Sequence, residues 1–153
     1  MFLDNDRCSE RLIFVRTIST LSMNDREFLR AFHDCKLSSE DFRHRGHLRL
    51  AWLVLRSHSL EESLRLLSVG IRQFASFKGA NDMYNETLTQ FWTRIVNHAI
   101  QEHPSAQEFE QFINALPILL DKQLPYSHWR RETLGSNLAR SGWLEPDLLP
   151  LPF

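Results

Sequence analysis

The sequence is poor in cysteine and glycine and has no long hydrophobic run. Its two cysteines, Cys8 and Cys35, lack CxxC spacing, which excludes a disulfide framework and indicates a reducing, cytoplasmic environment. Only five glycines occur, and this argues against a turn-rich β protein. No segment approaches the roughly 18 consecutive apolar residues that a transmembrane helix needs, so we expect no membrane partner.

The chain also lacks an excess of charge of either sign. It has 18 basic and 19 acidic side chains, a net charge of −1 and a pI near 6.7. We therefore expect no nucleic-acid partner, because a protein that binds nucleic acid nonspecifically needs a positive surface. The GxGxxG, phosphate-binding glycine-loop and GxSxG motifs are all missing, which disfavours nucleotide-dependent and serine-hydrolase chemistry.

What the chain does contain is apolar volume with helical periodicity. Its 153 residues are 42% hydrophobic and include 11 Phe and 4 Trp, enough for one compact core. Apolar residues recur at helical spacing in five segments, and prolines interrupt the pattern after residue 117. The sequence predicts an all-α, single-domain bundle of about five helices with an irregular, proline-containing C-terminal segment. The expected helices lie within 22–37, at about 45–57, 60–77 and 84–102, and directly after Ser105, with one short helix near 129–140.

Local signals predict where these helices begin and end. Ser22 or Asn24 can cap the first helix, and capping boxes are expected at Ser59 with Glu62 and at Ser105 with Glu108. Gly79 can take a positive φ in the break after the third helix. No helical stripe continues from residues 1–22 into residue 23. Residues 1–22 therefore form either an extension upstream of a domain at 23–153 or an arm packed on it.

Two histidines stand at the start of the second expected helix. His44 and His47 are three residues apart, so their side chains are neighbours on the stripe that faces the core. This spacing suits a shared divalent metal, a proton-transfer pair or a small-molecule ligand. A metal needs at least one further ligand, and two core histidines bonded to backbone carbonyls are the structural alternative.

Polar residues at the start of the fourth helix are the expected partners of these histidines. Tyr84, Asn85 and Thr89 point inward on the helical wheel, and buried polar groups require hydrogen bonds. Glu86 falls on the solvent side, where a carboxylate stabilises a helix N-terminus. If the first turn is unwound, this carboxylate can instead swing inward as a metal ligand or a base.

From about Met23 to Pro150 the chain resembles a family of small, uncharacterised bacterial all-helical proteins. The matching segments are "FLRAF" (28–32), "FRHRGHLRLAWLVL" (42–55), "YNETLT" (84–89) and "RETLGSNLARSGWLEPDLL" (131–149). Two blocks carry most of the likeness, F-x-H-x-x-H-L-R-x-A-W and Y-[HN]-E-T. The resemblance implies a domain start near Met23 and a single site built from His44, His47, Tyr84, Asn85, Glu86 and Thr89.

Asn85 departs from the histidine that is typical of the family at this position. The departure argues against a metal site with three histidines, because an amide oxygen is a poor ligand for zinc or iron. A divalent metal held by His44 and His47 stays a hypothesis.

Arg131 is a further candidate for ligand binding. It belongs to the cluster His128-Trp129-Arg130-Arg131, which can close over a pocket and contact an anion. The alternative is the solvated start of a helix.

The preferred function is a small-molecule enzyme or binding protein with a polar pocket that contains histidines. In an enzyme, His44 or His47 would move protons or hold the ion, Glu86 would act as base or ligand, and Tyr84 would donate a hydrogen bond. Asn85, Thr89 and Arg131 would contact the ligand or cofactor. The alternative is a non-catalytic helical interaction module with structural histidines, whose apolar tail (143–153) docks on a partner.

Overall fold

The computed structural model describes residues 23–153, and this part of the chain is all-α, with no strand. The predicted single-domain helical fold is confirmed. The question of whether residues 1–22 form an extension or an arm lies outside the described residues. Five helices have seven residues or more and are α2 (Asp25–His33), α3 (His44–Leu55), α4 (Leu60–Phe77), α5 (Glu86–Glu102) and α6 (Phe109–Ala115).

Short helical turns connect and follow these helices. The 3-10 turn η1 (Asn81–Met83) leads into α5, and two more such turns, η2 (Pro117–Leu120) and η3 (Leu124–Ser127), follow α6. Two five-residue helices then occupy the region expected to hold one short helix, α7 (Arg131–Gly135) and α8 (Asn137–Ser141). None of the helices in residues 23–153 is long and apolar enough to cross a membrane.

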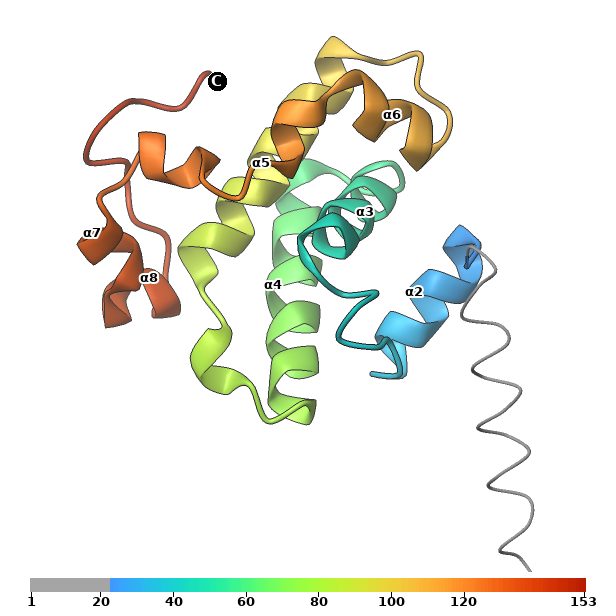
Figure 1. Ribbon diagram of the computed structural model, residues 1–153, viewed down its shortest axis with the longest axis horizontal. Coiled ribbons are helices and arrows are strands. Elements are labelled where there is room, and N and C mark those ends of the chain that lie inside the picture. The colour runs from blue at the N-terminus through green and yellow to red at the C-terminus, as the bar shows by residue number, and fades with distance from the viewer. Residues whose placement is uncertain (1–22) are drawn as a thin grey trace, which may run out of the picture.

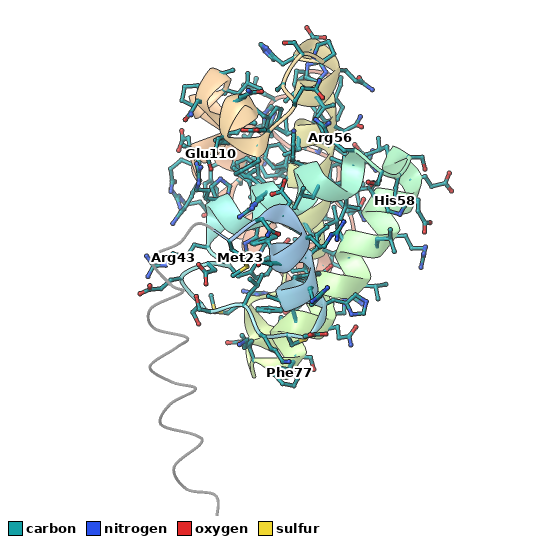
Figure 2. The ribbon with its side chains drawn as sticks, turned by 90° about the vertical axis from the view of Figure 1, so that its right-hand side faces the viewer. Met23, Arg43, Arg56, His58, Phe77 and Glu110 are labelled. Carbon is teal, nitrogen blue, oxygen red and sulfur yellow. The ribbon has the colours of Figure 1, made fainter. Side chains whose placement is uncertain are left out.

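Helix α5 is the centre of the bundle, because it packs against α3, α4 and α8 (Figure 1). Helix α2 covers the side of α3 and α4 that lies away from α7 and α8 (Figures 1 and 2). The core of the bundle is aromatic. Phe91 of α5 is fully buried, and its ring contacts the buried ring of Trp129 edge to face, with 5.4 Å between the centroids. Burial of large aromatic rings is the main stabilising contribution in a bundle of this size.

Most of the predicted helix starts are confirmed, and one is wrong. Asn24 forms a full capping box with Glu27, and the Ser59 hydroxyl accepts a hydrogen bond from the backbone N–H of Glu62. Gly79 has φ 68° at the break after α4, as its position predicts. The expected Ser105 cap does not form, because α6 begins only at Phe109 and its N-cap residue, Glu108, makes no side-chain capping bond.

The C-terminal tail lies on the body of the protein. The indole N–H of Trp129 donates to the carbonyl oxygens of Leu144 and Glu145, at 3.2 and 3.0 Å. His128 donates its Nδ1–H to the carbonyl of Leu149 at 2.9 Å. These bonds hold the tail against the end of the bundle near α7, and its docking on a partner stays a prediction.

Candidate functional site

The starts of α3 and α5 meet at a cavity of about 430 Å³. Five of the residues that were predicted to share a site line it together. These are His44, His47, Tyr84, Asn85 and Thr89. The remaining wall is largely apolar and aromatic and comes from α3, α4, α5 and the segment around η3. It consists of Ala51, Leu67, Ile71, Met83, Leu88, Trp92, Thr93, Lys122, Pro125 and Tyr126.

His44 is held in one tautomer by a backbone carbonyl. Its Nε2 lies 2.7 Å from the carbonyl oxygen of Leu119, and because that oxygen only accepts, Nε2 carries the proton. The ring packs edge to face against Trp92, with centroids 4.4 Å apart. The other ring nitrogen, Nδ1, therefore keeps its lone pair and has no hydrogen-bond partner among residues 23–153.

His47 is held in the opposite tautomer. Its Nδ1 donates to the carbonyl oxygen of Arg43 at 2.9 Å, and the ring stacks on Phe42 with centroids 4.0 Å apart. Its Nε2 is thus the unprotonated nitrogen, again without a partner in the described part of the chain. The histidines are therefore bonded to carbonyls, as the structural alternative requires, and they also line a cavity.

Both histidines are neutral at physiological pH. Burial lowers the pKa of His44 below its usual range, against the opposing effect of the hydrogen bond to Leu119. Burial also lowers the pKa of His47, where the hydrogen bond to Arg43 again opposes it. A neutral imidazole with one free nitrogen is a hydrogen-bond acceptor, a base or a metal ligand.

Asn85 and Thr89 line the cavity, but their polar atoms hold the fold together. The Asn85 Oδ1 caps α5 by accepting from the N–H of Leu88 at 3.0 Å, and its Nδ2 donates to the carbonyl of Leu134 at 2.7 Å. The Thr89 hydroxyl donates to the carbonyl of Asn85 at 2.9 Å. Thr89 has thus used its only donor toward the backbone, and Asn85 has used its amide oxygen and one of its two N–H donors.

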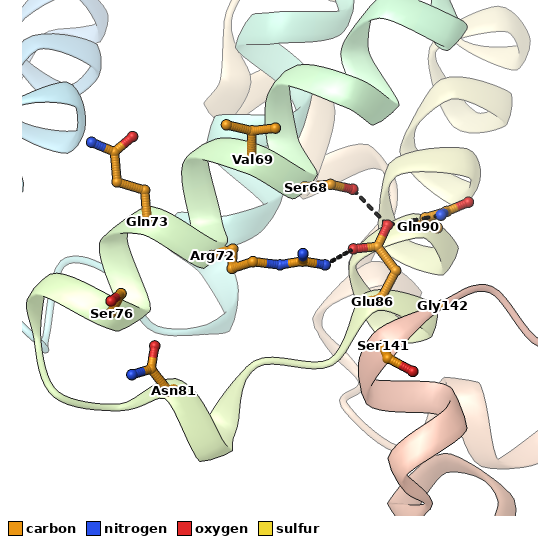
Figure 3. A pocket seen from close by; sticks show the side chains of 10 residues that line it. All are labelled: Ser68, Val69, Arg72, Gln73, Ser76, Asn81, Glu86, Gln90, Ser141 and Gly142. Atoms are coloured by element: carbon orange, nitrogen blue, oxygen red, sulfur yellow. Dashed lines mark hydrogen bonds and ion pairs between the residues drawn. The ribbon is translucent and has the colours of Figure 1, made fainter.

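Glu86 does not point to solvent, as the helical wheel predicted, but is buried with 7% of its surface exposed. Its carboxylate accepts hydrogen bonds from the side chains of Ser68 (2.7 Å) and Gln90 (2.8 Å). It also forms an ion pair with Arg72, whose Nη2 lies 3.1 Å away. Figure 3 shows Ser68 and Arg72 extending from α4 toward this carboxylate on α5. The side chain is buried because α4 covers the face of α5 that a lone helix would expose.

Glu86 and its partners Ser68, Arg72 and Gln90 form a polar network. This network lines a second, more open groove of about 690 Å³, and the groove is separate from the histidine cavity. Tyr84 connects the two, since its ring lines the cavity and its hydroxyl donates to Glu86 at 2.5 Å. The predicted roles of Glu86 as base or ligand and of Tyr84 as donor would require both to leave this network.

The hydrogen bonds that Glu86 receives lower the pKa of its carboxyl more than burial raises it. Burial raises the pKa of this carboxyl, but the hydrogen bonds from Tyr84, Gln90 and Ser68 and the charge of Arg72 bring it below the usual value. Burial, followed by the hydrogen bond to Glu86, raises the pKa of Tyr84. At neutral pH the carboxylate is therefore ionised and the phenol is protonated, which makes the pair an acceptor and a donor to each other.

Arg131 does not line the cavity. Its guanidinium lies over the ring of Tyr126, 4.1 Å from the centroid, and donates to the Gln123 side chain at 2.8 Å. It therefore supports Tyr126, which is a wall residue. A direct contact between Arg131 and a ligand stays a prediction.

Within the described residues, no third metal ligand accompanies the two histidines. Residues 23–153 contain no group of three or more His, Cys, Asp or Glu side chains that could hold a metal ion. The donation of one ring N–H to a carbonyl is nonetheless how metal-binding histidines are commonly oriented. Nδ1 of His44 and Nε2 of His47 are the atoms that would coordinate a metal.

The sequence did not predict the part of the cavity wall that comes from the C-terminal half of the chain. Lys122 and Tyr126 lie in the irregular segment, where no periodicity indicates which side chains turn inward. Trp92 was expected only as a core residue, although its contact with His44 makes it part of the cavity. Ser68 and Gln90 carried no signal, since a single polar residue in an amphipathic helix is ordinary.

Comparison with known proteins found no relative of this sequence. No family model matches the sequence, and neither a curated protein nor a solved structure matches it. The likeness to a bacterial helical family therefore stays a prediction, and the function has to be argued from the cavity.

Proposed function

We propose that the protein binds a small organic molecule in the histidine cavity. The molecule would have an apolar body and a head group that donates hydrogen bonds to Nδ1 of His44 and Nε2 of His47. One observation carries the proposal: both histidines line the cavity as neutral rings, and each has one nitrogen fixed by a carbonyl and the other unpartnered among the described residues.

The rest of the wall supports this chemistry. A volume of about 430 Å³ falls within the usual range of small-molecule sites, which are mostly apolar with a few convergent polar groups. Trp92 offers an aromatic surface beside His44, suited to a flat or aromatic body. Since each free nitrogen is also a base, a bound hydroxyl or amine could give up a proton to it in a catalysed reaction.

The test uses two probes of nearly the same shape. p-Cresol carries a hydroxyl donor, and p-methylanisole replaces that hydroxyl with a methoxy group that cannot donate. We expect p-cresol to shift the amide NMR signals of cavity residues and to bind about fivefold to tenfold more tightly than p-methylanisole, which corresponds to one hydrogen bond of about 1 kcal/mol.

A matched pair of variants identifies the acceptor. His47→Leu should remove the preference for p-cresol. His58→Leu is the control, because His58 also donates Nδ1–H to the carbonyl four residues earlier, Val54, but lies outside the cavity. Equal binding of the two probes by the unmodified protein, or an unchanged preference in both His44→Leu and His47→Leu, would show that the histidines do not receive a ligand.

A divalent metal is the second candidate, because both histidines already donate the N–H opposite to the coordinating nitrogen. Two protein ligands predict weak binding, which a third histidine would strengthen. We expect Asn85→His to lose about 1 kcal/mol of stability through its missing helix cap and to regain stability when zinc is added.

Asn85→Ala is the control for this test, since it loses the same cap without gaining a ring. Zinc should not stabilise it more than it stabilises the unmodified protein. If zinc affects the thermal midpoints of Asn85→His and Asn85→Ala equally, position 85 does not complete a metal site.

A further inference from the structure

Lys122 is the only charged side chain that lines the histidine cavity in the described part of the chain. It is exposed, and it forms no ion pair with any residue of 23–153. The neighbouring carboxylate, Asp121, does not line the cavity and accepts a hydrogen bond from the N–H of Gln123 at 2.9 Å. A cation at the mouth of the cavity is therefore available to a ligand.

The position of Lys122 is coupled to that of the histidines. Leu119 accepts the His44 N–H bond, and Lys122 follows it three residues later on the same segment. Burial is the main cause of the lowered His44 pKa; the charge of Lys122 also lowers this pKa, and the charge of the adjacent Asp121 raises it. The lysine and the two histidines therefore line one cavity and lie close enough for a single molecule to contact them all.

The inner wall is poorly suited to an anion. His44 and His47 are neutral and present lone pairs, and the hydroxyl of Thr93 is donated to the carbonyl of Thr89 at 2.8 Å. The remaining side-chain donors in the wall are neutral: the second amide N–H of Asn85, the indole N–H of Trp92 and the hydroxyl of Tyr126. A negative charge is thus stabilised at the mouth and repelled from the histidine nitrogens.

We propose that the ligand is a carboxylic acid with an apolar or aromatic body and a hydroxyl or amino group at the opposite end. Its carboxylate pairs with Nζ of Lys122, and its hydroxyl or amine donates to the histidine pair. This inference rests on the proposed function, because it assigns the second end of the same ligand.

The test adds a carboxylate to the probe that was used above. p-Hydroxyphenylacetate carries both groups, p-cresol carries only the hydroxyl, and p-tolylacetate carries only the carboxylate. At pH 7 the carboxyl group is ionised and the phenol is protonated. We expect p-hydroxyphenylacetate to bind about fivefold more tightly than p-cresol, the size of an ion pair at a partly exposed rim, and the gain to shrink at high salt.

Lys122→Gln should remove the gain in affinity of p-hydroxyphenylacetate over p-cresol and leave the affinity for p-cresol unchanged. Lys36→Gln is the control, because Lys36 is also an exposed lysine but pairs with Asp34 away from the cavity. His47→Leu should weaken p-hydroxyphenylacetate and p-cresol alike, so that the effects of the two variants add.

The outcomes separate the two proposals. If p-cresol binds but p-hydroxyphenylacetate is no tighter, or if Lys122→Gln keeps the gain, the assignment of the carboxylate is wrong and the proposed function stands. If p-tolylacetate binds as well as p-hydroxyphenylacetate, and more tightly as the pH falls, the anion sits on protonated histidines and the assignment is again wrong. If p-cresol and p-hydroxyphenylacetate both fail to bind, the proposed function itself fails.

Discussion

At the scale of single residues, the two histidines differ in the nitrogen that they leave free. His44 donates through Nε2 to a carbonyl far away in the sequence, whereas His47 donates through Nδ1 to the carbonyl one turn before it. Their spacing of three residues places the rings side by side, but the backbone bonds decide which lone pair each ring presents. A metal or a hydrogen-bond donor would thus meet two different edges of imidazole.

These histidines should make the stability depend on pH near neutrality. Both have a pKa below the unfolded value of about 6.5, so the folded state binds fewer protons than the unfolded state just below that pH. The stability that this difference contributes is complete above about pH 6.5 and is lost as the pH falls through the folded pKa. We expect the thermal midpoint to decrease between pH 7 and pH 5.

His47→Asn tests the assignment, since the asparagine Nδ2 can still donate to the Arg43 carbonyl but does not titrate. Thermal unfolding of this variant should depend less on pH in the same range. An identical slope in both proteins would mean that other groups cause the dependence.

The buried carboxylate of Glu86 stabilises the contact between α4 and the start of α5. Its two oxygens receive bonds from α4, from the residue two positions before it and from the next turn of α5. We expect Glu86→Gln to lower the free energy of unfolding by about 2 kcal/mol, because an amide cannot accept all of these bonds and lacks the charge that pairs with Arg72.

Urea unfolding at pH 7 measures this loss, and Glu102→Gln at the exposed end of α5 should change stability by less than about 0.5 kcal/mol. The folded pKa of Glu86 is lowered, so its contribution is present above about pH 4.3 and lost as the pH falls through the folded value. Equal stability of the two variants would contradict the role of the network.

At the scale of elements, the start of α3 positions the histidine pair, and Gly46 lies between the two residues. A Cβ at this position would overlap with the carbonyl oxygen of Asp41 and lie 3.1 Å from its carbonyl carbon. The backbone before α3 thus crosses the helix at the one residue without a side chain. This close approach explains a glycine inside a helix, where it otherwise costs stability.

Gly46→Ala should therefore destabilise the protein by about 2–3 kcal/mol, because backbone atoms must move to admit the methyl group. Gly135→Ala is the control, since nothing lies within 4 Å of a Cβ there, and it should change stability by less than about 0.5 kcal/mol. Chemical denaturation of both variants makes the comparison. A Gly46→Ala protein as stable as Gly135→Ala would rule out the close approach.

At the scale of the whole molecule, the first described residues tie α2 to the rest of the bundle. The Met23 carbonyl accepts a bond from Arg49 of α3 at 2.7 Å, and the Asn24 side chain caps α2. Arg49 also pairs with Asp25 at 2.6 Å. Within residues 23–153, Arg49 of α3 therefore fixes the start of α2 on the bundle.

Deletion of residues 1–22 should leave a folded protein whose thermal midpoint changes by only a few degrees. Deletion of residues 1–24 should lower the midpoint by about 4 °C more, since it also removes the cap and the Arg49 bond. Differential scanning calorimetry compares the two proteins. Loss of cooperative unfolding in the shorter deletion would mean that residues 1–22 belong to the core.

The sequence by itself determined most of the long helices, because helical periodicity and capping act over a few neighbouring residues. The range 60–77 was predicted with both of its ends, and its start at Ser59 follows from a side chain that bonds the next turn. For the first helix the sequence offered Ser22 or Asn24, and the structure has Asn24 as the cap. The same local periodicity also brought His44 and His47 together with Tyr84, Asn85 and Thr89, since two core-facing stripes at helix starts meet where those helices cross.

Only the tertiary structure decided that the Glu86 side chain is buried and that Lys122 lines the histidine cavity. A helical wheel assumes one buried face, but the start of α5 is covered from α3, α4 and the segment after α8, so its solvent side disappears. Lys122 lies in a segment without periodicity, and its place follows from the bond between Leu119 and His44, residues 75 positions apart. Contacts over such distances depend on how whole helices pack, and no pattern of neighbouring residues encodes them.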